Sequence, residues 1–347
     1  MSRQSNAKSI DFALIEMAMN TQHPGYQIVI ITKTLEKSFL SRLSYYFNLY
    51  KQMYHLATSK ACVVDSYIIP VSNLKHKKEL LIIQIGHGLV NSKKMGYQTL
   101  KKESGRNEKL AKLMNMHRNY DYVISTSKET SPYLAQAFNV DISKILDFGP
   151  PKLDYILDAK SKKHNVLSKY PKINDKSVIL YVSTFRTYKD DYLDKFIQHM
   201  PLEKYNIIIH LHPLNDTLHP EYDDKINQTK GVYRCGDVPT VDLLSIADHV
   251  VTDYSSFMFE AAIVGVPVYL FVPDYDKYLE KNGLNVDLLN EFQGAAFKDA
   301  KQLFQTIDKN NYDFQQLEKF KNKHIENADG NSTKKLISLI VDRKVDG

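Results

Sequence analysis

One segment, residues 247–271, constrains the fold of this chain more than any other. Its sequence is ADHVVTDYSSFMFEAAIVGVPVYLF. The apolar pattern predicts a strand at 249–252, a short helix at 256–264 and a second strand at 268–272. A strand, a helix and a strand in this order form a β–α–β unit, in which the two strands are parallel. The polar turn after the first strand therefore lies at the carboxyl edge of a sheet, where open parallel sheets bind ligands.

The turn carries residues that suit a phosphate group. It reads Asp253-Tyr254-Ser255-Ser256, so two hydroxyl groups stand directly before the predicted helix. The first backbone N–H groups of a helix have no partner within the helix, and the helix dipole favours an anion there. We therefore expect the turn 253–256 to hold the phosphates of a nucleotide.

The rest of the chain repeats this alternation of strands and helices. In the second half, strands are predicted at 177–182, 205–211 and 231–235, and helices at 190–199 and 241–246. In the first half, strands are predicted at 26–32, 61–64, 80–85, 122–126 and 145–148, and helices at 5–20, 36–57 and 132–138. Helices at 299–308, 314–327 and 332–343 close the chain. The alternation predicts an α/β protein with two doubly wound, Rossmann-like domains and a cleft between them.

The boundary between these domains is expected at Gly149-Pro150-Pro151, which ends the regular pattern of the first half. The next 25 or so residues are rich in Lys, Ser and Asp. We therefore expect one domain at 1–150 and a second at 151–330. The remaining segment, 331–347, is expected to form a C-terminal helix that packs back on the first domain.

Composition narrows the class of protein. The two cysteines, Cys62 and Cys235, lie far apart, which argues against a zinc module or a disulfide scaffold and suits a reducing compartment. No run of 18 apolar residues and no apolar leader segment is present, so neither a membrane span nor a signal peptide is expected. The net charge of +6 favours anionic small molecules or an anionic membrane surface over nucleic acid as partners.

Polar clusters follow several of the predicted strands. His87 stands between two glycines, Gly86 and Gly88, after the strand at 80–85, and an imidazole can act as a base near neutral pH. Thr184 and Arg186 follow the strand at 177–182, and an arginine there suits bidentate contact with phosphate. His212 follows the strand at 205–211. Each cluster taken singly is typical of a tight turn or a strand end, but together at one edge they predict a functional site.

Metal sites receive weaker support. His210 and His212 lie two residues apart, and Asp274-Tyr275-Asp276 matches the DxD pattern of metal-dependent transferases. A solvated turn is the favoured interpretation of that triplet, and no metal or other cofactor is expected. Phosphate-binding P-loops, dinucleotide-binding glycine motifs and serine-hydrolase elbows do not occur in the sequence.

The predicted helix at 36–57 has a broad aromatic face with basic residues beside it. Such a helix could lie in a membrane interface, assisted by Lys93, Lys94, Lys101 and Lys102. The alternative, which we favour here, is that the aromatic residues belong to the core.

Several of these motifs together resemble the CDP-glycerol glycerophosphotransferase family of teichoic-acid enzymes. The segments LYVSTFR, HLHP, DLLSIADHVVTDYSSFMFEAA and ENADGNSTKKL carry the resemblance in the second half, in the family's order and spacing. In the first half, IQIGHGLVNSKKMGY and DFGPPKLDYI are similar to two further family motifs. The resemblance implies a GT-B fold and a peripheral position at the cytoplasmic face of the membrane. It also implies transfer of a polyol phosphate from a CDP-polyol to a lipid-linked saccharide or polymer, with release of CMP.

The resemblance also implies roles for individual residues. His87 matches the catalytic base, with Gly88 beside it in the same motif. His212 and Arg186 match residues that face the donor diphosphate, and Ser255 and Ser256 match the phosphate-binding serines. Thr184 and Asp253 fall within the matching motifs, and Glu260 lies where a carboxylate could reach the ribose.

Two other functions fit the same pattern. A GT-B glycosyltransferase or 2-epimerase acting on a nucleotide sugar would also hold a diphosphate at the second domain. A non-catalytic nucleotide-binding protein at the membrane surface is the other alternative, because the family's Trp before the histidine is Gly86 here and its Thr-Pro is Leu89-Val90.

Overall fold

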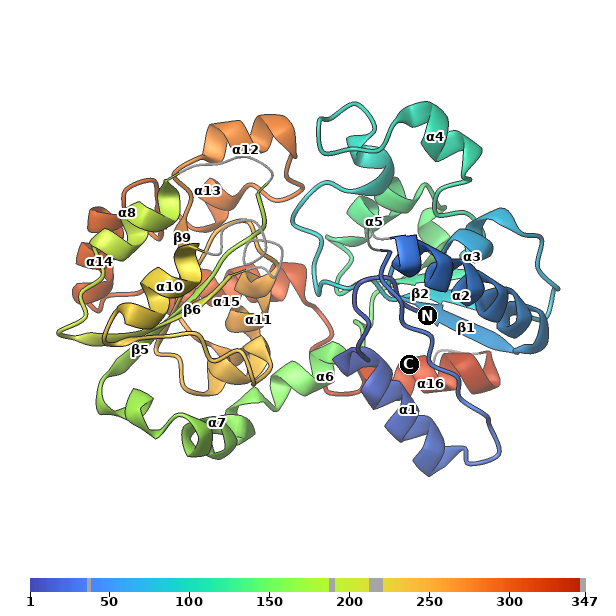
Figure 1. Cartoon of the computed structure of the whole chain (residues 1–347), viewed down its shortest axis with the longest axis horizontal. Coiled ribbons are helices and arrows are strands. Elements are labelled where there is room, and N and C mark those ends of the chain that lie inside the picture. The colour runs from blue at the N-terminus through green and yellow to red at the C-terminus, as the bar shows by residue number, and fades with distance from the viewer. Residues whose placement is uncertain (36–38, 187–190, 212–220, 344–347) are drawn as a thin grey trace. The chain divides into compact units, whose positions relative to one another are not determined.

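The computed structural model describes residues 1–35, 39–186, 191–211 and 221–343 (Figure 1). The chain forms two compact units. The first unit comprises Met1–Tyr155, Lys281–Gly283 and Lys323–Gly347, and the second comprises Ile156–Glu280 and Leu284–Asn322. The division between Tyr155 and Ile156 falls inside helix α6 (Lys152–Leu157).

The second unit is built on a six-stranded parallel sheet in the order β10-β9-β8-β5-β6-β7. The strands are β5 (Ser177–Val182), β6 (Tyr205–His210), β7 (Val232–Tyr233), β8 (His249–Thr252), β9 (Val268–Phe271) and β10 (Ala296–Phe297). The chain runs outward from β5 to β7, returns to the other side of β5, and runs outward again from β8 to β10. The point between β5 and β8 is therefore a topological switch point, where doubly wound sheets bind their ligands.

The central strands of this sheet are buried along almost their whole length. All four residues of β8 and of β9 are buried, as are five of the six residues of β5. Helices cover the sheet, and in the chain one of them precedes β5 while the others follow the strands. They are α7 (Lys163–Lys169), α8 (Tyr192–Gln198), α10 (Glu221–Gln228), α11 (Phe257–Val264), α12 (Tyr275–Lys281), α13 (Leu288–Glu291), α14 (Ala300–Asp308) and α15 (Phe314–His324). Burial on both faces explains why these strands read as continuous apolar runs.

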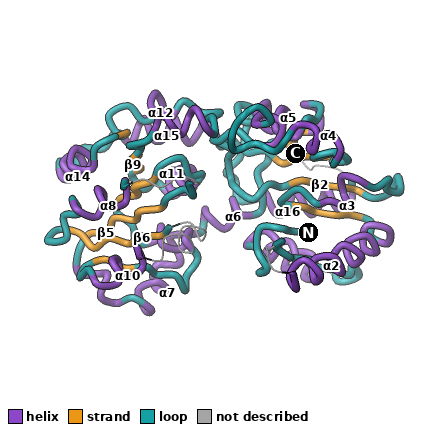
Figure 2. Tube along the Cα trace, turned by 45° about the horizontal axis from the view of Figure 1, so that its top comes forward, coloured by secondary structure: helices purple, strands orange, loops and turns teal. Residues whose placement is uncertain are grey.

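The first unit has a four-stranded parallel sheet in the order β1-β2-β3-β4. Its strands are β1 (Ala61–Val64), β2 (Leu81–Gln84), β3 (Tyr122–Ile124) and β4 (Ile145–Leu146). One face packs against α1 (Ile10–Gln22) and α16 (Ser332–Asp342), through Phe12, Ile83 and Leu336 among others. The other face packs against α2 (Phe39–Thr58), α3 (Ile69–Asn73) and α5 (Ser131–Phe138). Figure 2 shows β2 among these helices, and the short helix α4 (Glu108–Leu113) also belongs to this unit.

The prediction of a strand at 26–32 is wrong. Only a single parallel bridge between Ser2 and Thr32 forms in this segment. Ile28 and Ile30 pack against the first-unit core, so the apolar alternation reflects burial of one side of an extended segment. Among the described residues, the segment therefore forms a β-bridge with Ser2 only, and it adds no strand to the sheet.

The core interpretation of the aromatic residues of α2 is also wrong. Tyr46, Phe47, Tyr50 and Tyr54 are 53%, 64%, 52% and 65% exposed. The side of α2 that faces the protein instead carries Tyr45, Gln52 and Leu56, which are almost fully buried. None of the described helices is long and apolar enough to cross a bilayer.

Helix α11 begins and ends where its sequence predicts. Its cap residue is Ser256, and Gly265 ends it in the left-handed conformation with φ +77°. The Val266 N–H donates to the Ala261 carbonyl at 3.0 Å, which completes the C-terminal cap. These two ends fix the helix N-terminus directly after β8.

Candidate active site

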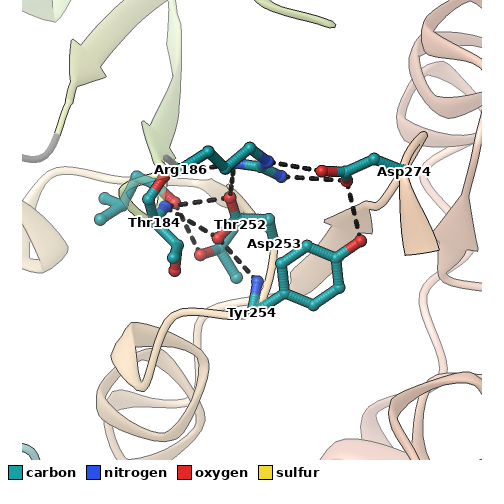
Figure 3. Close-up of polar contacts among 7 residues, drawn as sticks. Thr184, Arg186, Thr252, Asp253, Tyr254 and Asp274 are labelled. Carbon is teal, nitrogen blue, oxygen red and sulfur yellow. Dashed lines mark hydrogen bonds and ion pairs between the residues drawn. The ribbon is translucent and has the colours of Figure 1, made fainter. Parts of the chain in front are cut away.

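The turn that follows β8 is joined to the end of β5 at the switch point. The backbone N–H of Thr184 donates to both carboxylate oxygens of Asp253, at 2.9 Å each. The backbone N–H of Tyr254 donates to Oδ1 of the same carboxylate at 2.6 Å. Thr252 Oγ1 also donates to the Val182 carbonyl at 2.7 Å. The Asp253 side chain therefore ties together the carboxyl ends of the two central strands (Figure 3).

Arg186 extends this connection to a third strand. Its Nη1 donates to Asp253 Oδ2 at 2.8 Å and to the Thr184 carbonyl at 3.2 Å. Its Nε and Nη2 donate to the carboxylate of Asp274, which follows β9, at 2.6 and 3.2 Å. Figure 3 shows the guanidinium between these two carboxylates. One cation therefore links the ends of β5, β8 and β9.

The three charged side chains are buried together. The exposed fractions of the side chains are 2% for Arg186, 0% for Asp253 and 10% for Asp274. Burial acts to lower the pKa of Arg186, but the two carboxylates outweigh it, so the pKa is raised above its ordinary value. The guanidinium also lies 4.1 Å from the centre of the Tyr192 ring, a cation–π contact. The guanidinium of Arg186 is thus held by two carboxylates and the Tyr192 ring.

Tyr254 is fixed from both sides. Its hydroxyl donates to Asp274 Oδ1 at 2.9 Å, and its ring stacks on Tyr278 of α12 with the ring centres 3.6 Å apart and the planes at 9°. Burial and the neighbouring Asp274 carboxylate raise the pKa of the Tyr254 phenol well above its usual range. The phenol therefore stays protonated and donates its hydrogen bond throughout the physiological pH range.

The two predicted phosphate-binding serines lie half-buried where α11 begins. Ser255 Oγ accepts a hydrogen bond from the Phe257 N–H at 3.3 Å, which holds this hydroxyl at the first turn of the helix. No cap hydrogen bond forms to the Ser256 side chain. Glu260, one turn further along α11, is 4% exposed. The two serines are thus more exposed than Glu260 at this end of the helix.

Two other predictions concern residues beside the switch point. His212 lies outside the described residues, so its predicted position beside the diphosphate stays a prediction. His210, the other half of the metal alternative, has its Nε2 at 2.8 Å from Thr240 Oγ1. Within the ranges that the structure describes, no three His, Cys, Asp or Glu side chains lie close enough to hold a metal ion.

The solvated-turn interpretation of Asp274-Tyr275-Asp276 is wrong for its first residue. Asp274 is buried against Arg186 and Tyr254, whereas the Asp276 side chain is 85% exposed and pairs with Lys298 at 2.7 Å. The two carboxylates serve separate partners because Asp274 precedes α12 and Asp276 lies within its first turn.

His87 occupies the corresponding edge of the first unit, just after β2. Gly86 adopts φ +68°, a conformation that favours glycine, and it directs the chain into the loop. The exposed His87 ring has its Nδ1 at 3.3 Å from Gln4 Nε2. The protein atoms around the His87 ring displace part of its hydration and lower the pKa of His87 from 6.5, and the nearby Asp65 carboxylate opposes this shift. The neutral imidazole needed for a base is thus the favoured form at neutral pH. Gly88, the next residue, is half-buried.

Sequence reasoning missed three residues of these two sites. Asp274 and Tyr254 hold Arg186 and the turn, and Asp65 lies near His87. Asp65, Tyr254 and Asp274 stand one, two and three residues after a strand, so position at a strand's carboxyl end was the signal that could have found them.

The comparison with protein families places the whole chain in one family. Residues 1–342 match the family described as CDP-Glycerol:Poly(glycerophosphate) glycerophosphotransferase. The chain is 29% identical over 335 residues to the teichoic acid ribitol-phosphate primase of Bacillus spizizenii, covering 92% of this chain and 84% of that protein. It is 26% identical over 300 residues to the teichoic acid glycerol-phosphate primase of Bacillus subtilis, covering 84% and 76% of the two chains.

Solved structures support the fold. The wall teichoic acid polymerase TagF matches with a TM-score of 0.74 at 18% identity, over 99% of this chain and 87% of that one. A UDP-GlcNAc 2-epimerase from Methanocaldococcus jannaschii matches with a TM-score of 0.55 at 14% identity, over 90% and 94% of the two chains. At these identities the likeness shows the fold alone, and that fold is GT-B-like.

The predicted α/β, GT-B-like fold and the predicted transferase family are therefore confirmed. This chain belongs to the CDP-glycerol:poly(glycerophosphate) glycerophosphotransferase family and is a polyol-phosphate transferase of the teichoic-acid type.

Proposed function

We propose that this chain transfers glycerol phosphate or ribitol phosphate from a CDP-polyol to a hydroxyl group of a lipid-linked saccharide or polyol-phosphate polymer, and releases CMP. The observation that carries the proposal is the half-buried serine pair at the N-terminus of α11, held at the switch point by Asp253. A helix N-terminus at a switch point suits the diphosphate of a nucleotide donor. The family match supplies the class of donor.

On the donor side, Ser255 and Ser256 would hold the diphosphate, and His212 would stand beside it. Thr184 and Asp253 would keep the turn in place, and Glu260 would lie toward the ribose. Negative charge develops on the phosphate of the departing CMP. Hydrogen-bond donors directed at this charge lower the activation barrier most when the fold holds them in place before the reaction. The hydrogen bonds to Asp253 supply that fixation.

On the acceptor side, His87 would act as the general base, with Gly88 leaving room for the acceptor beside it. The acceptor oxygen attacks the phosphorus that carries the polyol, and its proton passes to the imidazole. The bond from that phosphorus to the oxygen of CMP breaks, and CMP leaves with the electron pair. The lowered pKa of His87 keeps the imidazole neutral and ready to accept the proton.

Ligand-dependent thermal unfolding tests the donor. CMP, CDP-glycerol or CDP-ribitol should raise Tm because a ligand that binds only the folded state stabilises it, by about 2.7 kcal/mol at a concentration of 100 times Kd. UDP-sugars at the same concentration should raise Tm less. Protection by UDP-sugars in preference to every cytidine nucleotide would favour the glycosyltransferase or epimerase alternative.

We further propose that the chain works at the cytoplasmic face of the membrane and that α2 contacts anionic lipid. The exposed apolar side chains of α2 are Leu43, Tyr46, Phe47, Tyr50 and Tyr54. The helix contains no acidic residue, and it carries the exposed Arg42 and Lys51. Aromatic and basic side chains together suit the interface of an anionic membrane, where each basic residue contributes about 1 kcal/mol.

Co-sedimentation with vesicles tests this surface. The wild-type chain should bind vesicles that contain phosphatidylglycerol at low salt, and Phe47→Ser should reduce binding about tenfold, because a large apolar side chain no longer enters the interface. The matched control is Phe314→Ser, which removes a phenylalanine of similar exposure (56%) from α15. Equal losses in both variants, or no wild-type binding at low salt, would contradict a role for α2.

A further inference from the structure

Asp274 contacts both sides of the turn that we assign to the donor phosphates. Through Arg186 it reaches Asp253, the first residue of the turn, by way of bonds of 2.6 and 2.8 Å. Through the hydroxyl of Tyr254 it reaches the second residue of the turn at 2.9 Å. Figure 3 shows these two connections diverging from the same carboxylate. A single side chain after β9 therefore fixes two consecutive residues after β8.

Both connections end on groups that have little freedom to move. The Asp253 carboxylate accepts three backbone hydrogen bonds from the two strand ends, and the ring of Tyr254 lies flat on Tyr278. Both side chains are completely buried. If Asp274 lost its charge, Arg186 would keep one carboxylate and the Tyr254 hydroxyl would donate to a weaker acceptor. The backbone that carries Ser255 would then be held less firmly.

We propose that Asp274 is a positioning residue for the donor phosphates, acting through Arg186 and Tyr254 on the serine turn. This inference rests on the proposed function and deepens it. Asp274 is 10% exposed and already pairs with a cation, so it acts on the ligand through these neighbours. A carboxylate in direct contact with the diphosphate would repel it, and the Arg186 guanidinium that lies between Asp274 and Asp253 offsets one of their two negative charges.

Asp274→Asn tests the proposal, with CMP binding measured by calorimetry below the unfolding temperature of each variant. The amide keeps the size of the side chain and removes its charge, so the charge-assisted bonds weaken and CMP should bind about tenfold more weakly. Asp276→Asn is the matched control, because the same change two residues away affects a side chain that is 85% exposed. Its CMP affinity should equal that of the wild type. If Asp274 had only a structural role, Asp274→Asn would have a lower Tm, but its folded form would bind CMP with the wild-type affinity.

Tyr254→Phe gives a second test that keeps the ion pairs and so guards against failure of Asp274→Asn to fold. Like Asp274→Asn, Tyr254→Phe should bind CMP more weakly than the wild type does. In the double variant the two losses should fall short of their sum, because both changes act on one connection.

Equal CMP affinity in Asp274→Asn and Asp276→Asn would overturn the inference. Tighter binding in Asp274→Asn would overturn it too, since it would mean that Asp274 withholds Arg186 from the phosphate. These outcomes are distinct from failure of the proposed function. In that case the wild type would bind CMP without producing CMP from any CDP-polyol, or it would bind no CMP at all.

Discussion

Replacing His87 with alanine is expected to slow CMP release from a CDP-polyol by about 10²–10⁴-fold, the contribution typical of a general base. His87 follows β2 at the carboxyl edge of the first-unit sheet, and its ring is exposed to an incoming acceptor. The measurement is the rate of CMP release at saturating donor, together with circular dichroism to verify the fold. His164→Ala is the matched control, because His164 is an exposed histidine on α7. Full activity in His87→Ala would remove His87 from the mechanism.

The pH profile provides an independent signature of the same residue. A general base works in its neutral form, and the pKa of His87 is lowered from 6.5. The wild-type rate should therefore hold as pH falls to about 6.5, the ordinary pKa of histidine, and decline only below it. The residual rate of His87→Ala should lack this decline. A wild-type decline that begins well above pH 6.5 would contradict the assignment.

The second large effect concerns stability. Arg186→Met should lower the free energy of unfolding by about 3–5 kcal/mol, since it leaves two buried carboxylates without their cation. Asp253 is completely buried and Asp274 nearly so, and both receive charge-assisted bonds from the guanidinium. Chemical denaturation at neutral pH measures the change.

Two variants calibrate that result. Arg186→Lys keeps the charge, but an ammonium group cannot bridge both carboxylates as the planar guanidinium does, so its stability should lie between those of Arg186→Met and the wild type. Lys204→Met breaks the surface pair with Asp308 and should change stability little. An Arg186→Met chain as stable as the wild type would show that the buried cluster does not depend on its cation.

The second-unit sheet could be predicted from the sequence because its strands are buried on both faces. The apolar run of β5 and the Val250-Val251 pair of β8 predicted strands, and the structure confirms both at their predicted bounds. The segment at 26–32 is also rich in apolar residues but forms one bridge only. Of its apolar residues, Ile31 is buried and Val29 is exposed, and whether such a segment joins a sheet depends on neighbours that the sequence pattern does not specify.

Helix α2 shows a second limit. Its periodicity predicted a helix, and the structure confirms one at Phe39–Thr58. Which side faces the protein could not be read from hydrophobicity, because Gln52 is buried and Phe47 is 64% exposed. Packing against α3 and the sheet decides the orientation, and the more apolar side is left outward.

The candidate site likewise contains residues that the sequence pattern could place and a pairing that it could not. Residues that follow predicted strands, such as Thr184 and Asp253, could be gathered at one edge from the sequence, and the structure brings them within hydrogen-bond distance. The pairing of Arg186 with Asp274 joins positions 88 residues apart, and no local pattern carries that information. The DxD pattern even suggested a different role, because it groups Asp274 with a neighbour whose side chain points to solvent.

The most direct test of the account is turnover with a lipid-linked disaccharide and either CDP-glycerol or CDP-ribitol. One of the two donors should yield one CMP for each polyol phosphate added to the acceptor, whose mass rises by one such unit, or by several if addition is repeated. The wild-type chain should give both products, and His87→Ala should give neither at a comparable rate. Absence of CMP release from every CDP-polyol, with the folded chain and the acceptor present, would contradict the proposed transfer.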